Sequence, residues 1–348
     1  MDLACLLIAD DLTGACDASV QFALRGLAAR VSLDPGSEAG ATGVLAISTE
    51  SRGGDLASFR QALERLPPLR PRILFKKIDS TLRGNIGQEV AATLAVFGCD
   101  RAVVTPAFPA MGRAVEAGYL RVVGDSGFVP REVAGCFRDL PAAVRARIAL
   151  RDAACDAHLD AIVREELAGG RRILWAGSAG LAAALARATG AGSAAEMAFS
   201  PGPGIFCLGS DHAVTLAQQE RLLRHRAAAL FAAGHAPNEA ILDALERRRH
   251  VVLRISRGHT SAARVRQLLM GIAGPLALCG GDTASLVCCA LAVNAIELRR
   301  EVAPGIPCGI IQGGPFDALP VVTKSGGFGR PDALIEVADF FTCSPPLH

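Results

Sequence analysis

The sequence predicts an α/β protein of two domains, each a mainly parallel sheet flanked by helices. A short apolar run, a loop rich in Gly, Ser and Asp, and an Ala- and Leu-rich stretch at helical spacing recur along the chain, which is typical of parallel sheets covered by helices. The length of 348 residues exceeds what one hydrophobic core usually serves. A stretch rich in Gly, Ala, Ser and Pro over residues 189–204 interrupts the alternation. We therefore expect domains over 1–198 and 203–342.

The first domain is expected to contain strands that each lead into a polar loop. Their apolar runs are Cys5–Ala9, Val44–Ile47, Ile73–Phe75, Ala102–Thr105 and Ile173–Ala176. A helix is expected after the first strand and its loop, ending at about Gly26. In open α/β sheets ligands bind beyond the carboxyl ends of the strands, so these loops are the expected site.

The same pattern restarts in the second domain. Its strands are expected at Ile205–Leu208, Val251–Ile255, Leu276–Cys279 and Gly309–Ile311. A helix is expected from about Ala213, and another opens at the glycines that follow the third of these strands.

Composition excludes several classes of protein. Hydrophobic residues make up 51% of the chain and charged residues 20%, the profile of a globular protein. A net charge of +2 and 5% aromatic residues leave no basic stripe for nucleic acid, so we expect no nucleic-acid partner. No apolar run is long enough to span a bilayer, and the apolar N-terminus lacks a basic region and is interrupted by aspartates, so we expect a buried strand there. No membrane partner is expected, and an oligomer is compatible with the sequence.

The eleven cysteines show irregular spacing and no C-x-x-C pair. We expect small buried thiols in a reducing cytoplasm, without a structural metal site. Cys5, Cys207, Cys279 and the pair Cys288-Cys289 lie in apolar runs.

The loops of the first domain combine carboxylates with cations. They supply Asp10, Asp11, Arg52, Lys76, Lys77, Asp79, Ser80, Arg83 and Asn85. Carboxylates orient hydroxyls or accept a proton, and cations suit an anion. We therefore expect a ligand that is small, polyhydroxylated and anionic.

Some of these residues have a simpler interpretation. Asp11 could cap the helix that follows it, although only one of two adjacent aspartates can do so. Lys76 and Lys77 could be an ordinary solvated pair at a strand end. The segment 78–85 is denser in hydrogen-bonding groups than a connecting loop requires, which favours a functional interpretation.

Glycine loops distinguish the second domain. Gly280-Gly281-Asp282-Thr283 follows an apolar strand and opens a helix, whose free N–H groups attract anions. Gly209-Ser210 is arranged likewise, and 325–329 forms a third flexible loop. Each alone could be a tight turn, but three together predict a phosphate site. No common nucleotide motif is present. His212 could approach a bound ligand or lie on a surface loop.

In combination, seven motifs in this order resemble the four-carbon acid sugar kinase family over nearly the whole chain. They are Ala9–Ala15, Ser48–Arg52, Lys76–Asn85, Pro106–Pro109 with Gly112-Arg113, Gly177–Ala182, Gly280–Ala284 and Val322–Gly329.

The resemblance implies an ATP-dependent kinase that phosphorylates the terminal (C4) hydroxyl of a sugar acid such as threonate, erythronate or 3-oxo-tetronate, with Mg²⁺. It implies a first domain that binds the sugar acid, a second that binds ATP, and an active site in the cleft between them. Asp10, Asp11, Arg52, Lys77, Asp79 and Arg83 would line the sugar-acid site. Ser210, Gly280, Gly281, Asp282, Thr283 and Gly326 would contact the nucleotide. One of Asp10 and Asp11 would align or deprotonate the hydroxyl.

This chain departs from the family in three places. It is shortened between Tyr119 and Arg151 and between Arg254 and Leu276, and Asp211–Val214 replaces the usual small and polar residues. Two other functions stay open: a phosphatase or hydrolase that uses the paired aspartates on a phosphorylated sugar acid and, because of the shortened segments, a non-catalytic sugar-acid-binding protein.

Overall fold

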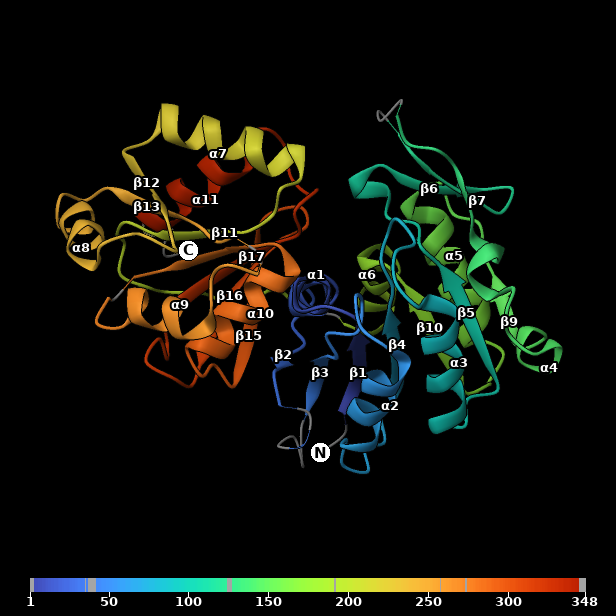
Figure 1. Cartoon of the computed structure of the whole chain (residues 1–348). Coiled ribbons are helices and arrows are strands. Elements are labelled where there is room, and N and C mark those ends of the chain that lie inside the picture. Colours follow the sequence, from blue (N-terminus) through green and yellow to red (C-terminus); the bar gives the residue numbers. More distant parts are fainter. Residues whose placement is uncertain are drawn as a thin grey trace. The chain divides into compact units, whose positions relative to one another are not determined.

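The computed structural model describes residues 3–34, 36, 42–123, 127–190, 192–256, 258–272 and 274–343. The chain divides into two compact units, Met1–Ala194 and Ala195–His348. Each unit has a sheet covered by helices on both faces, which confirms the predicted fold class (Figure 1).

A parallel sheet forms the centre of the first unit, in the order β2-β3-β1-β4-β10-β5-β9. Its strands are β1 (Leu3–Ala9), β2 (Ala29–Ser32), β3 (Gly43–Ser48), β4 (Ile73–Lys77), β5 (Arg101–Thr105), β9 (Ile148–Leu150) and β10 (Ile173–Gly177). Residues of β1 and β4 are buried along their whole length, as expected for a strand covered on both faces.

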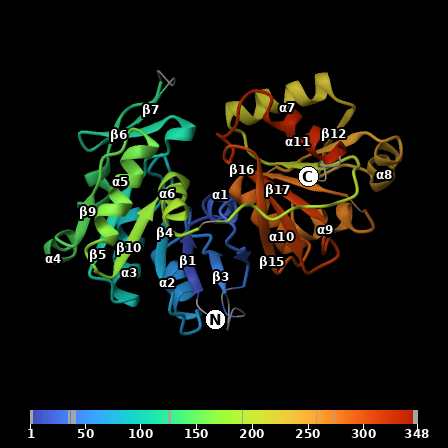
Figure 2. The same ribbon diagram turned by 180° about the vertical axis from the view of Figure 1, so that it is seen from behind.

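Helices cover this sheet in two groups (Figures 1 and 2). The helix α6 (Ala179–Thr189) packs against α1 (Leu12–Ala23) and α5 (Asp156–Leu167), whereas α2 (Leu56–Glu64) packs against α3 (Ile86–Val96). The first helix ends at Ala23 rather than near Gly26, whose φ of 79° turns the chain toward β2.

A small antiparallel sheet was not predicted from the sequence. It consists of β6 (Arg113–Glu116), β7 (Tyr119–Val122) and β8 (Arg131–Glu132), and is followed by the short helix α4 (Ala142–Arg145). Its strands are too short to give a clear alternation of apolar and polar residues.

The second unit has a mixed sheet in the order β12-β13-β11-β14-β17-β16-β15. Its parallel strands are β11 (Ile205–Leu208), β12 (Ala228–Ala232), β13 (His250–Arg254), β14 (Leu276–Cys279) and β17 (Pro320–Lys324). The strands β15 (Ala295–Ala303) and β16 (Ile306–Gln312) form an antiparallel hairpin instead. Pro304 and Gly305 connect them, and Gly305 has a φ of 74°, the conformation that the second central residue of a type II turn requires.

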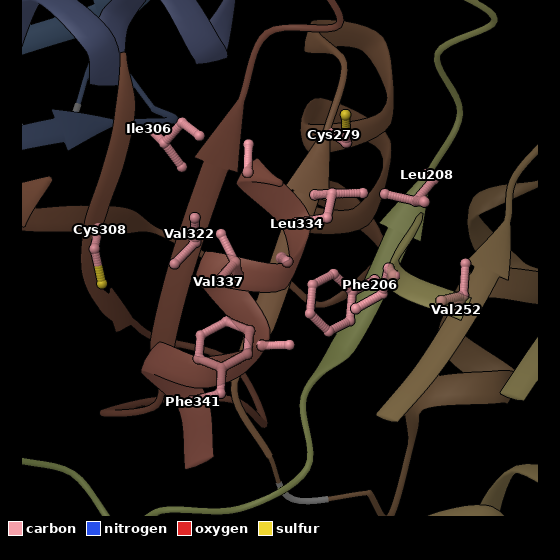
Figure 3. Close-up of a cluster of buried hydrophobic side chains, with 14 of the residues drawn as sticks. Phe206, Leu208, Val252, Cys279, Ile306, Cys308, Val322, Leu334, Val337 and Phe341 are labelled. Atoms are coloured by element: carbon pink, nitrogen blue, oxygen red, sulfur yellow. The ribbon is translucent and has the colours of Figure 1, made fainter. Parts of the chain in front are cut away.

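The core of the second unit lies between the sheet and two helices, α7 (Ala213–His225) and α11 (Ala333–Thr342). Figure 3 shows Leu334, Val337 and Phe341 of α11 packed against strand residues that include Phe206 and Val322. The helices α9 (Ala262–Leu269) and α10 (Gly281–Ala290) pack against each other, and α8 (Asn238–Glu246) packs on β13.

All eleven cysteines are free. Cys5, Cys207, Cys279 and Cys288 are buried as expected, whereas Cys289 is exposed because it lies on the outer side of α10. None of the helices in the described ranges is long and apolar enough to cross a membrane.

Candidate functional site

The carboxyl ends of three neighbouring strands bring the predicted polar loops of the first unit together. The strand β1 pairs with both β3 and β4, with Ala9 opposite Ser48 on one side and opposite Lys77 on the other. The loops that follow these three residues therefore begin side by side, at the edge where α/β proteins bind ligands.

Arg52 binds both adjacent aspartates. Its Nε and Nη2 donate to Asp10 Oδ2 and Oδ1 at 2.7 and 2.8 Å, while Nη1 and Nη2 donate to Asp11 Oδ2 and Oδ1 at 2.6 and 2.9 Å. Both carboxylates are buried, and the Arg52 side chain is 22% exposed. Such bidentate pairs fix orientation as well as charge, so the three side chains form one rigid group.

Asp11 has two roles in the structure. Its Oδ1 accepts a hydrogen bond from the backbone N–H of Gly14 at 2.8 Å and caps α1, and its Oδ2 accepts from Thr13 Oγ1 at 3.0 Å. Asp11 therefore caps the helix, as one interpretation predicted, and also belongs to the charged group around Arg52.

Asp79 organises the next loop. Arg83 donates to it through Nε at 2.9 Å and Nη2 at 2.7 Å, and Thr81 donates through N at 3.1 Å and Oγ1 at 2.6 Å. Arg52 Nη2 lies 3.7 Å from Asp79 Oδ1, which connects this loop to the two adjacent aspartates. The Arg83 side chain stays 59% exposed, so it can also meet an anionic ligand.

The two lysines of β4 lie in different environments, because successive side chains of a strand point to opposite faces. The ammonium of Lys77 lies near the first turn of α1, where a Cβ added to Gly14 would be 3.1 Å from its Nζ and 2.4 Å from Asp11 Oδ1. Lys76 Nζ instead pairs with Glu89 Oε2 at 2.8 Å and lies 5.3 Å from the Phe59 ring centroid. Both members of that pair are buried, so Lys76 is placed in a core ion pair.

Two further expected residues lie in the loop after β4. Ser80 is buried, with 4% of its surface exposed. Asn85 precedes α3 and is exposed, and its Nδ2 donates to the Gly54 carbonyl at 3.1 Å. Asn85 thus connects this loop to the one that carries Arg52.

The charges balance within this group, which holds three carboxylates (Asp10, Asp11, Asp79) and three cations (Arg52, Lys77, Arg83). Burial alone would raise the pKa of Asp10, but the charge and hydrogen bonds of Arg52, with smaller contributions from Lys76 and Lys77, hold that pKa below its usual range. Asp79 behaves likewise: its pKa is held well below the usual range by Arg83 and Arg52, against the effect of burial. Both side chains are therefore carboxylates at neutral pH.

The glycine loops of the second unit also converge, because β11, β14 and β17 are neighbours. A Cβ added to Gly209 would lie 2.1 Å from Thr283 Oγ1, and one added to Gly326 would lie 2.2 Å from Ser210 Oγ. Gly280 adopts a φ of 101° and directly precedes α10. These loops approach closely only because they lack side chains, and the approach leaves backbone N–H groups near a helix N-terminus.

The structure places the other expected residues of this unit around the same loops. Gly281 and Asp282 lie in the first turn of α10. His212, at the start of α7, is exposed, and its Nε2 would be 3.1 Å from a Cβ on Gly327. His212 thus lies beside the third glycine loop as well as on the surface.

Two buried residues, one beside each loop cluster, were not predicted as functional from the sequence. Glu89 accepts a hydrogen bond from Ser51 at 2.6 Å and pairs with Lys76, and it therefore supports the residue that precedes Arg52. Lys324 ends β17 and donates to the carbonyl of Ser325 at 3.0 Å. Lys324 could have been identified from the sequence, because a lysine at the end of an apolar strand is unusual. Glu89 gave no such signal, because a glutamate in a helix is usually solvated.

Comparison with known proteins matches a different family model to each unit. The model of a sugar-binding N-terminal domain matches residues 5–134, and the model of a nucleotide-binding C-terminal domain matches residues 205–334. The chain is 34% identical over 397 residues to a D-threonate kinase of Bordetella bronchiseptica, which covers 95% of this chain and 96% of that protein. Because the alignment is longer than the 348-residue chain, that relative carries additional residues.

Further relatives differ in the acid they are named for. A D-erythronate kinase of Heliobacterium modesticaldum is 28% identical, over 96% of both chains. A 3-oxo-tetronate kinase of Cupriavidus necator is 28% identical, over 94% of this chain and 95% of that protein. A crystal structure of a Salmonella typhimurium LT2 protein, described as a tRNA synthase, has the same fold: its TM-score is 0.75 at 21% identity, over 97% of this chain and 99% of that chain.

Proposed function

The chain belongs to the four-carbon acid sugar kinase family, and on that premise we propose that it transfers the γ-phosphoryl group of ATP to the terminal (C4) hydroxyl of a four-carbon sugar acid. Threonate, erythronate and 3-oxo-tetronate are the candidate substrates, because the relatives are named for these acids. The observation that carries the proposal is the contrast between two loop clusters, one of paired carboxylates and cations and one of glycines at a helix N-terminus.

We assign sugar-acid binding to the first unit, in the domain 1–198. The side chain of Arg83 is more than half exposed while it binds Asp79, and Lys77 lies beside the N-terminus of α1. These cations, beside the positive end of that helix, suit a carboxylate ligand. Buried carboxylates beside them suit hydroxyl groups, because an ionised carboxylate only accepts hydrogen bonds.

The second unit, in the domain 203–342, is assigned to the nucleotide. Ser210, Gly326 and the first turn of α10 would hold the phosphates, which fits the close approach of Gly209 to Thr283 and of Gly326 to Ser210. Mg²⁺ bound to the phosphates would neutralise charge that develops in the transition state. The protein's own contribution is to fix donors and to exclude water.

Between the two adjacent aspartates, we assign the contact with the reacting hydroxyl to Asp10. A carboxylate offers about four acceptor positions. Asp11 uses them on Gly14, Thr13 and two nitrogens of Arg52. Among the described residues, the Asp10 carboxylate accepts only from two nitrogens of Arg52. Asp10 Oδ2 also lies 3.4 Å from the position of a Cβ on Gly84, so a glycine flanks it. Because phosphoryl transfer needs little proton removal before the transition state, alignment by a low-pKa carboxylate suffices.

One assay tests the proposed reaction against its alternatives. The purified protein is mixed with Mg²⁺, ATP and each stereoisomer of the C4 sugar acids, and ADP is measured. We expect ADP formation with one acid well above the rate without acid. Phosphate release from a phosphorylated sugar acid in the absence of ATP would instead identify a phosphatase. Binding of an acid without ADP formation would identify a binding protein.

Two variants test the assignment of Asp10. In Asp10→Asn we expect kcat to fall by about 100-fold or more, since the hydroxyl loses its charged acceptor, with a smaller change in melting temperature. Either variant weakens the ion pair with Arg52, but the single amide oxygen in Asp11→Asn cannot accept all four hydrogen bonds that Asp11 accepts, so melting temperature should fall more than in Asp10→Asn. Wild-type kcat in Asp10→Asn would overturn the assignment.

A further inference from the structure

Lys324 is a buried lysine beneath the third glycine loop. Its Nζ lies 3.0 Å from the Ser325 carbonyl oxygen, 3.1 Å from that of Phe328 and 3.3 Å from that of Gly326. A fourth oxygen, Thr215 Oγ1 on α7, is also 3.3 Å away. An ammonium group has three N–H donors, so these four oxygens occupy all of them.

These contacts fix the direction of the loop backbone. The carbonyl groups of Ser325 and Gly326 point toward Lys324, and the peptide bonds are trans in the described segments. In a trans peptide the N–H points opposite to the C=O. The N–H groups of Gly326 and Gly327 therefore point away from the core, on the side of the loop that faces outward.

Two residues of α7 donate hydrogen bonds to carbonyl groups of the same loop. Thr215 Oγ1 donates to the Gly326 carbonyl at 2.6 Å. Gln218 Nε2 donates to the carbonyls of Phe328, Gly329 and Arg330 at 3.1, 3.2 and 2.8 Å. The loop is thus fixed by its carbonyl groups, which leaves its outward N–H groups for another partner.

The outward surface of this loop adjoins other groups that attract anions. Ser210 Oγ would be 2.2 Å from a Cβ on Gly326, and Ser210 Cβ would be 3.5 Å from a Cβ on Gly280, which precedes α10. Successive backbone N–H groups and a helix N-terminus both favour negative charge. The same place therefore combines two kinds of neutral anion-binding group.

Lys324 adds a full charge behind them. Within the described ranges no carboxylate lies at ion-pair distance from its Nζ, and all four oxygen partners are uncharged. Burial lowers the pKa of Lys324, and nearby Cys279 only partly opposes this. A buried cation that lacks a counter-charge is stabilised by an anion that binds on the other side of a thin loop.

We propose that Lys324 is a positioning residue for the nucleotide phosphates, which orders the Ser325–Phe328 loop through its carbonyl groups and supplies the positive charge that faces a phosphate bound to the loop's outward N–H groups. This inference rests on the nucleotide-binding role proposed above for the second unit.

The charge on Lys324 gives this role a pH signature. When the ammonium loses its proton, the loop loses both a donor and the charge behind it, so MgATP binding weakens as pH rises through the lysine's pKa in the protein. The stability of the nucleotide-free protein changes in the opposite direction: between that lowered pKa and the unfolded value of 10.5, the unfolded chain binds more protons, so stability rises with pH. A purely structural lysine would show the second effect without the first.

The experiment measures the Kd of MgATP by calorimetry between pH 8 and pH 10 for the wild type, Lys324→Met and Thr323→Val. We expect the wild-type Kd to rise with pH. In Lys324→Met the Kd at pH 8 should be about 10- to 100-fold weaker, comparable to losing a charged hydrogen-bonding group, and should no longer depend on pH. Thr323→Val is the matched control, because the buried Thr323 hydroxyl has no hydrogen-bond partner among the residues that the structure describes and lies one residue away.

Further variants separate charge from loop order. Thr215→Val keeps the lysine and removes a support of the Gly326 carbonyl, so it should weaken binding while the pH dependence persists. Other titratable groups among the described residues are Cys279, which lies 3.5 Å from Thr215 Oγ1, His212 beside Gly327, and Asp282 in the first turn of α10. Cys279→Ser, His212→Asn and Asp282→Asn should each retain the pH dependence.

The outcomes separate this inference from the function on which it rests. Absence of MgATP binding in the wild type would overturn the nucleotide-binding role itself. If the wild type binds MgATP with a Kd that is constant from pH 8 to pH 10, the role of Lys324 is wrong even where Lys324→Met fails to fold. The role is equally wrong if Lys324→Met retains wild-type affinity, or loses affinity but keeps the wild-type pH dependence.

Discussion

Arg52 determines the geometry of the first loop cluster. A single guanidinium holds two adjacent carboxylates through four hydrogen bonds of 2.6–2.9 Å. Only the planar fork of arginine can do this, since a lysine ammonium is a point charge. The positive charge of Arg52 also offsets the electrostatic repulsion between the two buried carboxylates.

Replacing Arg52 by lysine should therefore keep the charge and lose the geometry. We expect kcat/KM for the sugar acid to fall by about 100-fold, the cost of misplacing a reacting group by roughly 1 Å. Steady-state kinetics with the preferred acid measure this. Arg65→Lys, in an exposed pair with Asp34, is the control and should leave kinetics unchanged. Equal kinetics of Arg52→Lys and the wild type would show that charge alone is required.

Asp79 should make the protein sensitive to acid. Its pKa is held far below the ordinary 3.8, so the unfolded chain binds the proton first as pH falls. The stability that Asp79 contributes is therefore complete above pH 3.8 and is lost as pH falls below it. We expect the stability difference between wild type and Asp79→Asn to narrow below that pH in urea titrations from pH 6 to pH 3. In the exposed pair with Arg247, Asp243→Asn should show little change. A difference independent of pH would contradict the proposed ion pairs.

At the scale of elements, strand alternation separates two neighbouring lysines. Lys77 faces the first turn of α1, and Lys76 faces α2 and α3, where Glu89 and Phe59 surround it. Both lysines were predicted to bind the substrate, although adjacent side chains of a strand point to opposite faces of the sheet. We propose instead that Lys76 acts on the site through Glu89 and Ser51, which precedes Arg52.

Breaking this buried pair should destabilise the protein more than it changes substrate binding. For Glu89→Gln we expect a loss of about 3 kcal/mol in the free energy of unfolding, because the Lys76 charge stays buried without its partner. Denaturant titration measures the loss. The double variant Lys76→Met/Glu89→Leu should recover part of it. Glu220→Gln, in an exposed pair with Arg224, should change stability by less than about 1 kcal/mol. A loss in Glu89→Gln no larger than in this control would contradict a core role.

At the scale of the whole molecule, the two units carry different loop clusters. Each has its own sheet and buried core, and the kind of loop cluster differs: carboxylates with cations in one, glycines with a buried lysine in the other. The proposed reaction requires the phosphates and the acceptor hydroxyl to meet during turnover. Because each ligand is assigned to its own unit, we expect that the binding of each can be measured separately.

Hydrogen exchange measured by mass spectrometry should reveal that division. A non-hydrolysable ATP analogue with Mg²⁺ is expected to slow exchange in peptides that contain 209–212, 280–283 and 325–329. The preferred sugar acid should slow exchange in peptides that contain 10–14 and 79–85, since bound ligands suppress local opening. Peptides from β6 to β8 serve as the internal control. Protection of the glycine loops by the sugar acid alone would contradict the assignment.

Much of the fold followed from short-range pattern. The strands that begin at Leu3, Gly43, Ile73 and Ile205 and the helix that begins at Ala213 all lie where apolar runs predicted them. The small β6–β8 sheet was missed because strands of two to four residues carry too little periodicity. The predicted strand Gly309–Ile311 lies within β16, but its antiparallel partner β15 was missed.

By itself, the sequence determined the α/β class, the polar loops at strand ends and the glycine loops, because each depends on residues close together in the chain. Only the tertiary structure decided which side chains meet. Arg52 lies 42 residues from Asp10, Glu89 38 residues from Ser51, and Thr215 109 residues from Lys324. No local sequence pattern encodes contacts between residues so far apart in the chain. Strand order and the face on which each side chain emerges set these contacts, and both are fixed only when the sheet is assembled.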